Sequence, residues 1–369
     1  MATSRSTVSG IPLRNAAIPL IETAAWDDDT VAALVSSAVR DEREVFPLHL
    51  LHDKEVENSP DVAAMKRACG WSLAVDGGEA AKSPEALFRL LEVLLDAMPR
   101  PQGTIVAVGG GTLLNVANLV AALLHRGTRF VAVPTTVMSM ADVAVGSKAM
   151  VNFGGRKNVI GVYNNPTAIV LCRRFLETLP EAQRLEGLSE CLKHALLQDA
   201  DLFHEIAASG GAMATGRLFE VAKTTALLKS AALAADPFEI GAARRVLHYG
   251  HLHAHSMERA TGFALSHGFA VYWGVLVELA VADSPVFPAA AALVRGLPSV
   301  RSALAAAFDG IDEATLRAAC NTDNKVQHVL GPDAFTFVGV PAIGTCGDVG
   351  TCSWGEVWSA CRKAASHIA

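Results

Sequence analysis

The chain has 369 residues, of which 51% are hydrophobic and only 18% charged, so it can bury the cores of two domains. Its net charge of −6, the absence of a basic run and an aromatic content of 6% argue against a nucleic-acid partner. No run of 18 uncharged apolar residues occurs, so we expect no membrane span. The start lacks a signal-peptide core and the seven cysteines form no CxxC pair, which favours a reducing cytoplasm.

Strand and helix patterns alternate in the first half of the chain. Residues 1–12 are small and polar and predict a disordered tail. Further on, apolar runs predict strands in FPLHLLHD, WSLAVDGGE, TIVAVGGG and RFVAVPTT. Between them, Ser83-Pro84 is a good helix start, and TLLNVANLVAALLHR has helical apolar spacing. This alternation predicts a parallel sheet covered by helices, as an α/β nucleotide-binding domain over residues 13–180.

The second half has a different pattern. After Pro180 the long Ala- and Leu-rich segments EGLSECLKHALLQ, LFEVAKTTALLKSAALAA, ARRVLHYGHLHAHSMERAT and HGFAVYWGVLVELAVA predict helices. Only AFTFVGVPAI, near the end, reads as a strand. We therefore expect an all-α C-terminal domain over residues 181–369. A small-molecule site is expected in the cleft between the two domains.

A glycine turn, Gly109-Gly110-Gly111, joins a predicted strand to a helix start. Glycine lets the backbone approach a pyrophosphate, and the helix end offers free N–H groups to the anion. Asp53, at the end of an upstream strand, could accept a ribose hydroxyl. The turn is not the GxGxxG fingerprint, and such turns also occur without a ligand. Asp53 taken alone is better explained as an ordinary turn residue.

Three residues far apart in the sequence have the chemistry of an open zinc site: Glu190, His251 and His267. One carboxylate and two imidazoles leave a fourth position for water or substrate. Lys193 shares a helix face with Glu190, and His255 shares one with His251. The alternatives are a surface ion pair for Glu190 and Lys193, and partly buried structural histidines for the others.

A polar segment lies in an otherwise apolar region. Asp142, Lys148, Asn152, Lys157 and Asn158 fall within 17 residues and are interspersed with glycines. Lysine and asparagine near glycine can hold a phosphate as a point charge and as hydrogen-bond donors. The alternative is a solvated loop.

A series of motifs in a fixed order resembles the sugar phosphate cyclase family, whose best-known member is 3-dehydroquinate synthase. The motifs run from about Asp53 to Lys325 and are GGEAAKS, GGGTLLN, HRGTRFVAVPTT, DVAVGSKAMVN, RKNVIG, FLETLP, GLSECLK, YGHLHAH and SHG. The resemblance implies a two-domain fold of the dehydroquinate synthase type, transient use of NAD, and a divalent metal, zinc or cobalt.

The resemblance also implies roles for individual residues. The metal ligands would be Glu190, His251 and His267. NAD would contact Asp53, Glu79, Lys82, Gly110, Gly111, Asn115, Thr135, Thr136, Lys157, Thr178 and Leu179. The catalytic residues would be Asp142, Lys148, Lys193, Lys229 and His255, the last of them near the phosphate, and the substrate would also meet Asn158, Arg244, His248 and Lys325. In the family Arg126 reaches the neighbouring subunit's phosphate site, which implies a homodimer.

The chemistry implied by this resemblance begins with a phosphorylated sugar. The metal lowers the pKa of a secondary alcohol, so that hydride leaves to NAD. The new ketone acidifies the adjacent C–H, phosphate is eliminated, and the hydride returns. The ring then opens and closes again by an internal aldol reaction. Asp142, Lys148 and Lys193 are of the right type to relay protons and orient hydroxyls.

Three positions depart from the 3-dehydroquinate synthase pattern: Asn115 replaces Asp, His248 replaces Asn, and Phe269 replaces Glu. We expect His248 in the substrate pocket, which predicts a different sugar. Asn115, Tyr249 and the run from Asp323 to Lys325 look more like 2-deoxy-scyllo-inosose synthase, which uses glucose 6-phosphate. NFGGRKN looks more like the valiolone synthases, which use sedoheptulose 7-phosphate.

The sequence therefore favours a cyclase that makes a cyclitol ketone for specialised metabolism, from a heptulose or hexose phosphate. Three alternatives stay open. One is a diverged 3-dehydroquinate synthase, since Lys229 and Arg244 would suit a substrate carboxylate. Another is an NAD- and metal-dependent polyol or glycerol-phosphate dehydrogenase. The last is a non-catalytic nucleotide-binding homologue.

Overall fold

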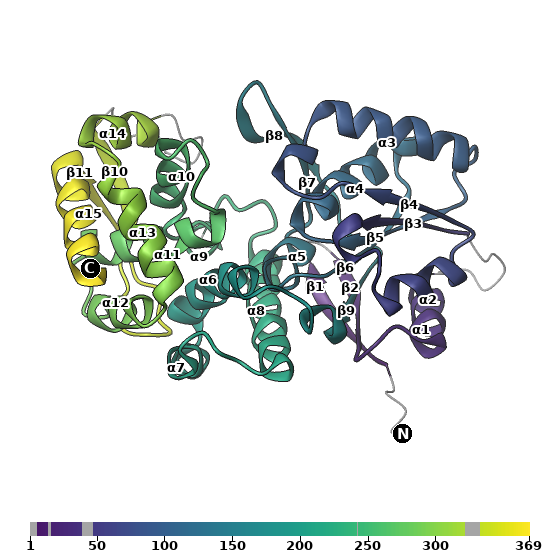
Figure 1. Ribbon diagram of the computed structural model, residues 1–369, viewed down its shortest axis with the longest axis horizontal. Helices are drawn as coiled ribbons and strands as arrows, with labels where there is room; N and C mark the ends of the chain where they lie inside the picture. Colours follow the sequence, from purple (N-terminus) through teal and green to yellow (C-terminus); the bar gives the residue numbers. More distant parts are fainter. Residues whose placement is uncertain (1–5, 14–15, 39–46, 242, 322–332) are drawn as a thin grey trace. The chain divides into compact units, whose positions relative to one another are not determined.

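The computed structural model describes residues 6–13, 16–38, 47–241, 243–321 and 333–369 (Figure 1). The chain divides into two compact units. The first contains residues up to Leu179 together with Thr215–Pro237, and the second contains Pro180–Ala214 together with the chain from Phe238 onward. The return of residues 215–237 to the first unit is a feature that the predicted division into 13–180 and 181–369 does not contain.

The first unit is built on a seven-stranded sheet in the order β1-β2-β9-β6-β5-β3-β4. All neighbouring strands run parallel except β1 and β2, which are antiparallel. The strands are β1 (Thr7–Leu13), β2 (Ala16–Thr23), β3 (Leu48–Asp53), β4 (Trp71–Val75), β5 (Thr104–Gly109), β6 (Arg129–Pro134) and β9 (Ala168–Cys172). The predicted parallel α/β sheet is confirmed, and its carboxyl edge collects the loops that follow each strand.

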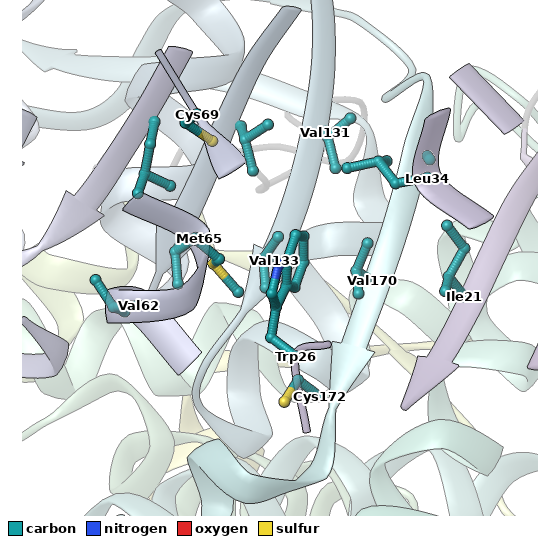
Figure 2. Close-up of a cluster of buried hydrophobic side chains, with 14 of the residues drawn as sticks. Ile21, Trp26, Leu34, Val62, Met65, Cys69, Val131, Val133, Val170 and Cys172 are labelled. Atoms are coloured by element: carbon teal, nitrogen blue, oxygen red, sulfur yellow. The ribbon is translucent and has the colours of Figure 1, made fainter. Parts of the chain in front are cut away.

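Helices cover both faces of this sheet (Figure 1). On one side lie α1 (Asp28–Ala38) and α2 (Pro60–Ala68), and on the other α3 (Pro84–Ala97) and α4 (Gly111–Leu123). Every residue of β5 is buried, as expected for a central parallel strand. Figure 2 shows Trp26 packed among Val133, Met65 and Val170 in the core between the sheet and the first pair of helices. The predicted N-terminal cap of α3 is also present, because the Ser83 hydroxyl accepts a hydrogen bond from the Ala86 N–H.

The prediction of a disordered tail is wrong for residues 7–12, which belong to β1. This strand pairs along its whole length with β2, from Thr7 opposite Glu22 to Leu13 opposite Ala16. Gly10 and Pro12 made the segment read as irregular, but proline is tolerated on the outermost strand of a sheet. Ile11 and Leu13 are buried and fix which face of the strand turns inward.

The polar segment that could have been a solvated loop is instead ordered structure. It contains one π-helical turn, η4 (Ser139–Val143), a short helix, α5 (Ala144–Gly146), and an antiparallel hairpin of β7 (Lys148–Phe153) and β8 (Arg156–Tyr163). Almost all of β8 is exposed, so its sequence shows no apolar alternation that would have predicted a strand.

Helix α8 (Thr215–Ala235) belongs to the first unit, where it packs on β1 and η4. Lys223 pairs with Glu22 at 2.9 Å, and the Ser230 hydroxyl donates to the Pro12 carbonyl. These contacts join the helix to the β1–β2 pair, which explains why residues 215–237 return to this unit.

The second unit is mainly helical, as predicted, and is built around α11 (His267–Val281), whose residues 270–280 are all buried. Its other helices are α6 (Glu181–Gln198), α7 (Ala200–Ser209), α9 (Ala243–Leu247), α10 (His251–Ala260), α12 (Phe287–Arg295), α13 (Pro298–Asp309), α14 (Glu313–Asn321) and α15 (Trp354–Ile368). It is not entirely α, because β10 (Ala334–Val338) and β11 (Val349–Ser353) form a two-stranded antiparallel sheet. The apolar alternation of AFTFV predicted the first of these strands.

Two glycines let α10 and α11 approach each other backbone to backbone. Gly250 precedes α10 with a φ of 70°, a conformation that favours glycine. A Cβ at Gly250 would lie 2.7 Å from the Gly274 carbonyl carbon, and one at Gly274 would overlap the Gly250 carbonyl oxygen. The start of α10 is therefore held against the middle of α11.

None of the seven cysteines, all of which lie in the described ranges, forms a disulfide, and six of them are buried. Cys346 and Cys352, close in sequence, form no disulfide, in agreement with the prediction. Within the described ranges, no helix combines the length and apolar character needed to cross a membrane.

Candidate active site

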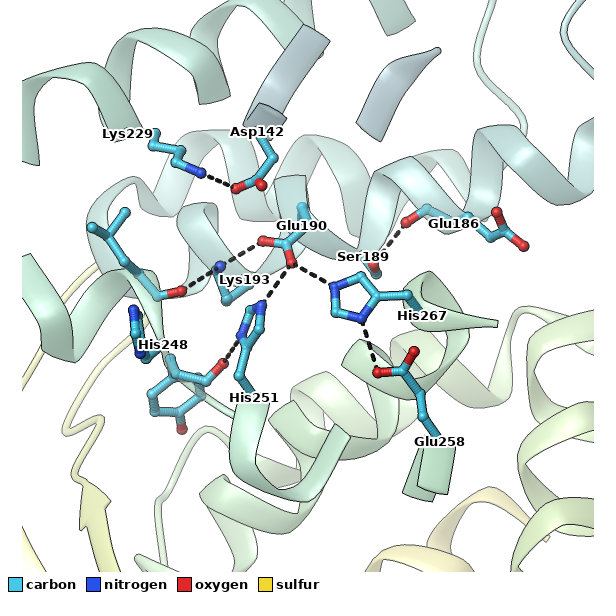
Figure 3. Close-up of polar contacts among 12 residues, drawn as sticks. Asp142, Glu186, Ser189, Glu190, Lys193, Lys229, His248, His251, Glu258 and His267 are labelled. Carbon is cyan, nitrogen blue, oxygen red and sulfur yellow. Dashed lines mark hydrogen bonds and ion pairs between the residues drawn. The ribbon is translucent and has the colours of Figure 1, made fainter. Parts of the chain in front are cut away.

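Helix α6 carries a fully buried ion pair. Glu190 and Lys193 lie one helical turn apart, each is only 1% exposed, and Lys193 Nζ lies 2.5 Å from Glu190 Oε2 (Figure 3). Lys193 Nζ also donates to the Leu247 carbonyl at 3.1 Å. A surface ion pair is therefore excluded. The lysine holds one carboxylate oxygen and leaves the other, Oε1, to face two histidines.

His251 is the first residue of α10, directly after Gly250. Its Nε2 lies 3.2 Å from Glu190 Oε1. Its Nδ1 lies 3.1 Å from the Tyr249 carbonyl oxygen. Because a carbonyl only accepts, Nδ1 must carry the proton, and the neutral ring then turns the Nε2 lone pair toward Glu190.

His267 occupies the same place on the next helix, as the first residue of α11. Its Nε2 lies 3.8 Å from Glu190 Oε1, and its Nδ1 lies 3.2 Å from Glu258 Oε2 (Figure 3). The neighbouring Gly268 packs so closely on α6 that a Cβ there would overlap the backbone of Glu186. This approach of α11 to α6 brings His267 within reach of Glu190.

The three side chains fit a divalent metal. Their ligand atoms lie within 4.8 Å of one another. Two ligands at about 2.0–2.1 Å from a tetrahedral zinc stand about 3.3 Å apart, close to the observed 3.2 and 3.8 Å. With both Nδ1 atoms protonated, lone pairs of Nε2 and of Glu190 Oε1 face each other, and a cation between them would relieve that repulsion. Holding Nδ1 by a carbonyl or a carboxylate is also the usual outer shell of zinc-bound histidines.

The charge of Glu190 suits this role. Burial by itself raises the pKa of the carboxyl, but Lys193, together with His251 and His267 when their rings are protonated in the absence of a metal, outweighs it and holds the pKa well below its usual range. The group is therefore an ionised carboxylate, the form that binds a metal.

Two further histidines surround this cluster. The His255 ring lies 5.6 Å from that of His251 and 5.8 Å from that of His267, one turn along α10 as predicted. The His248 ring lies 6.4 Å from that of His251. His253, between the ligand positions, points away and lies 3.6 Å from the buried Glu278.

In the first unit, six of the predicted NAD residues gather at the carboxyl ends of four adjacent parallel strands, β4, β3, β5 and β6. They are Asp53 at the end of β3, Glu79 after the Gly77-Gly78 turn that follows β4, Gly110 and Gly111 after β5, and Thr135 and Thr136 after β6. Ligands of open α/β sheets bind at this edge. The Gly110 N-cap makes no side-chain hydrogen bond, so the α4 N-terminus stays open to an anion.

Asp53 is in close contact with the glycine turns on either side. A Cβ at Gly77 would overlap the Asp53 carboxylate, and a Cβ at Gly109 would lie 3.2 Å from Asp53 Cβ. Asn115, on α4, is buried, and no residue of the described chain forms a hydrogen bond with its Oδ1. An orphaned buried acceptor beside an open helix end fits a bound dinucleotide.

The residues after β4 are linked to the β7–β8 hairpin. Asn152 Nδ2 donates to Glu79 Oε1 at 2.8 Å, and the Asn152 N–H donates to the Lys82 carbonyl at 2.9 Å. Burial lowers the pKa of Lys82 to about 8. Asn158, at a φ of 60°, donates its N–H to Asn152 Oδ1, and Lys157 precedes it on β8. The structure thus groups Glu79, Lys82 and the start of β8.

Asp142 and Lys229 form an ion pair between η4 and α8 of the first unit (Figure 3). Lys229 is buried, and a Cβ at Gly146 would lie 3.4 Å from its Nζ. Lys148 begins β7, two residues after that glycine. Asp142 and Lys229 were each predicted to contact the substrate, but their pairing with each other was not predicted.

The remaining predicted residues are placed as follows. Thr178 and Leu179 follow η5 (Arg173–Leu176), and Arg126 is exposed with a φ of 67° at the end of η3 (Leu124–Arg126). Arg244 lies in α9, and Lys325 lies outside the described residues.

Two carboxylates in the second unit were not predicted. Glu258 holds His267, and Glu239 lies 2.8 Å from His248 Nε2. Glu258 could have been found, because it stands seven residues after His251 on the same helix face. Glu239 lies in a non-helical segment with a φ of 57° and has no sequence signal.

Comparison with known families agrees with the motif series. Residues 72–186 match the family model of the 3-dehydroquinate synthase N-terminal domain, and residues 187–326 match that of the C-terminal domain. The two matches are contiguous and together span more than half of the chain.

Curated relatives include the 3-dehydroquinate synthase of Pyrobaculum islandicum, 36% identical over 211 residues, which are 56% of this chain and 61% of that protein. The 3-dehydroquinate synthase of Chlamydia muridarum is 33% identical over 223 residues, 59% of each chain. The matched region thus spans about three fifths of the length of these relatives.

Solved structures share the fold at low sequence identity. A 2-deoxy-scyllo-inosose synthase, complexed with carbaglucose-6-phosphate, NAD+ and Co2+, superimposes with a TM-score of 0.81 at 22% identity, over 97% of this chain and all of that one. The 2-epi-5-epi-valiolone synthase of Streptomyces hygroscopicus, with NAD+ and Zn2+ bound, gives 0.73 at 22%, over 96% and 98% of the two chains. From the two family matches and this shared fold, we conclude that the chain belongs to the 3-dehydroquinate synthase family of sugar phosphate cyclases.

Proposed function

We propose that this protein is a metal- and NAD-dependent sugar phosphate cyclase. It converts a heptulose or hexose phosphate, sedoheptulose 7-phosphate or glucose 6-phosphate, into a cyclitol ketone and inorganic phosphate. The observation that carries the proposal is the convergence of Glu190, His251 and His267, with both Nδ1 atoms held and Lys193 bound to the same carboxylate. The names of the solved relatives, which include NAD+ and Co2+ or Zn2+, support the cofactors.

Both cofactors have fitting residues. Glu190, His251 and His267 would hold zinc or cobalt, and Asp53, the Gly110-Gly111 turn and Asn115 would hold NAD. When bound, these groups supply polarisation of an alcohol and a reversible hydride acceptor. Everything else in the reaction is left to side chains of the protein.

Three lysines have roles in the proposed reaction. Lys193 keeps Glu190 ionised and fixes its orientation, so that Oε1 points at the histidines. Lys229, buried against Asp142, offers an ammonium whose proton can be shared with a substrate hydroxyl or carboxylate. Lys82, with a pKa lowered to about 8, is a buried positive charge suited to the anionic cofactor.

We also propose that the protein acts as a homodimer in the cytoplasm. Arg126 is exposed and could reach a second copy. The β7–β8 hairpin exposes five large apolar side chains, an unusual number for a surface that stays in water: Phe153, Val159, Ile160, Val162 and Tyr163. Light scattering after gel filtration tests the dimer, which a monomeric mass at micromolar concentration would contradict.

One alternative has an observation in its favour. The curated relatives are named 3-dehydroquinate synthase, which supports a diverged enzyme of that activity. His248 supports the cyclitol proposal instead, because it stands at the position of an asparagine in the 3-dehydroquinate synthase pattern and lies beside His251.

Phosphate release by the purified protein with NAD and zinc or cobalt tests the function. Glucose 6-phosphate, sedoheptulose 7-phosphate and the dehydroquinate precursor would be compared, and products identified by NMR. The proposal predicts phosphate release from one of the first two sugars, without net NADH and with loss of activity in EDTA. Activity only with the dehydroquinate precursor would establish the alternative. Net NADH formation would indicate a dehydrogenase, and the absence of both metal and turnover would indicate a non-catalytic homologue.

A further inference from the structure

A second group of metal-ligand side chains adjoins the first. The first site consists of Glu190, His251 and His267, and the ligand atoms of His255, Glu258 and His267 also lie within 4.8 Å of one another. All of them belong to the second unit, with His255 and Glu258 on α10 and His267 at the start of α11. Two imidazoles and one carboxylate are again the donor set of an open zinc site. The same chemistry is thus present on both sides of His267.

His267 lies between two carboxylates (Figure 3). Its Nε2 lies 3.8 Å from Glu190 Oε1, and its Nδ1 lies 3.2 Å from Glu258 Oε2. With an ion on Nε2, the ring keeps one proton on Nδ1, which it donates to Glu258. The separation of 3.2 Å also matches the distance of about 3.3 Å between two ligands of a tetrahedral zinc. The space that holds this proton therefore also suits an ion.

His255 distinguishes this group from a simple outer shell. An outer shell needs only the carboxylate that holds the far nitrogen of a ligand histidine, and Glu258 supplies it. His255 stands one turn before Glu258 on α10, so the two share a helix face. The His255 ring lies 5.8 Å from that of His267, close to the 5.6 Å between the two imidazoles of the first site, His251 and His267. His255 therefore completes a set of three ligands.

The burial of the three side chains suits an ion that enters from solvent. The Glu258 side chain is only 3% exposed, whereas that of His267 is 38% exposed and His255 is partly exposed. A buried carboxylate is costly unless it is paired or bound to a metal. The two imidazoles thus give an ion access to a buried negative charge.

We propose that His255, Glu258 and His267 form a second binding site for zinc or a similar divalent cation, joined to the first site by the His267 ring. When the second ion binds, the Nδ1 proton of His267 passes to solvent, and the ring then holds one ion on each nitrogen. Two cations this close repel each other, so the second ion binds more weakly than the first. Its fourth position is open to water or to an anionic group. The proposal rests on the proposed function in one respect, the ion at the first site.

Metal titration of the full chain tests the inference. Metal-free protein would be titrated with zinc, and the bound zinc would be counted by mass spectrometry at equilibrium. A parallel titration with Co2+ would be followed by visible absorption, in which a thiolate charge-transfer band would reveal binding to cysteines instead. The variants are His255→Asn, Glu258→Gln and the matched control His204→Asn, which changes an exposed histidine on α7.

We expect the wild type to bind two equivalents, the second at least about tenfold more weakly than the first. His255→Asn should weaken the second equivalent at least about 100-fold and leave the first within about threefold, because His255 is a ligand of the second site alone. Glu258→Gln should also lose the second equivalent, which keeps the test valid if His255→Asn does not fold. His204→Asn should bind two equivalents. A single equivalent in the wild type, or a second one that persists unchanged in His255→Asn, would overturn the inference.

The two proposals fail in different ways. One tight equivalent, together with phosphate release from a sugar phosphate, would overturn this inference and leave the proposed function standing. Two equivalents with the expected dependence on His255, but no phosphate release from any of the sugars, would do the reverse. Wild-type protein that binds no zinc would remove both.

Discussion

Lys193 lies 2.5 Å from Glu190, and each side chain is only 1% exposed. A pair this deeply buried is usually close to neutral for stability, because the cost of desolvating both charges offsets their attraction. Its value here is chemical. The lysine occupies one carboxylate oxygen and leaves the other facing two imidazoles, where the proposed metal would bind.

The first prediction concerns this cluster. Glu190→Gln and His251→Ala should each weaken zinc binding at least about a hundredfold, because losing an outer-shell partner alone costs about 10–100-fold. Both should also lose phosphate release. Zinc content after dialysis, measured by mass spectrometry, checks the expectation, with His204→Ala as the control. Full zinc occupancy in either variant would remove the metal assignment.

The second prediction concerns Glu258, which holds His267 Nδ1 at 3.2 Å. Glu258→Ala should weaken zinc binding about 10–100-fold, although the three proposed ligands remain. Glu258→Gln retains an acceptor oxygen and should recover part of the loss. Competition with a chelator gives the affinities, and Glu92→Ala, an exposed change on α3, is the control. Equal affinity in Glu258→Ala and the control would show that the contact plays no part in metal binding.

The third prediction concerns a change that affects NAD binding without affecting metal binding. A methyl group at Gly77 would overlap the Asp53 carboxylate and displace it. Gly77→Ala should therefore weaken NAD binding about 10–100-fold, which is the effect of losing a hydrogen bond to a charged group, without changing the zinc content. Gly70→Ala is a matched control, since a Cβ there meets nothing within 4 Å. Quenching of protein fluorescence on titration with NAD measures the NAD affinity of both variants. An unchanged affinity in Gly77→Ala would argue against Asp53 as an NAD contact.

The fourth prediction is a pH dependence of stability. Burial raises the pKa of Glu278 from 4.5 to about 7, although its bonds with the Val338 and Gly250 N–H groups oppose the shift. The folded state therefore favours the protonated carboxyl, and wild-type stability falls as pH rises from about 4.5 through about 7. The side chain cannot titrate in Glu278→Gln. The free energy of unfolding of this variant, relative to that of the wild type, should therefore increase as pH rises from about 4.5 to about 7.

Urea unfolding of metal-free protein at pH 5 and pH 8 measures the difference. Titratable groups near Glu278 include His253, at 3.6 Å, Tyr249 and Cys352, and all three are present in each protein. Their contributions largely cancel in the comparison. A free energy of unfolding of the variant that stays level or falls relative to the wild type between pH 5 and pH 8 would contradict the predicted shift.

The parts of the fold that could be predicted are those whose apolar periodicity is undisturbed. β5 and β6 are continuous apolar runs, and α11 is apolar on all sides, so each was recognisable. β1 escaped prediction because Gly10 and Pro12 interrupt it and most of it is exposed. β8 escaped because it is exposed almost throughout and has no buried face to impose alternation.

The site was predictable where residue chemistry is rare, and unpredictable where loop geometry decides. Glu190, His251 and His267 form an unusual set of ligand types, and the structure brings their atoms within 4.8 Å of one another. The contact between Glu239 and His248 depends on a left-handed loop residue and could not be read from spacing. The pairing of Lys229 with Asp142 likewise requires the return of α8 to the first unit.

The contact between Gly250 and Gly274 has a consequence for how this family can diversify. The position of His251 at the head of α10 is set by main-chain atoms that no substitution of a neighbouring side chain replaces. The proposed metal ligand at position 251 is thereby independent of the side chains around it, and the residue at position 248 can change without moving it.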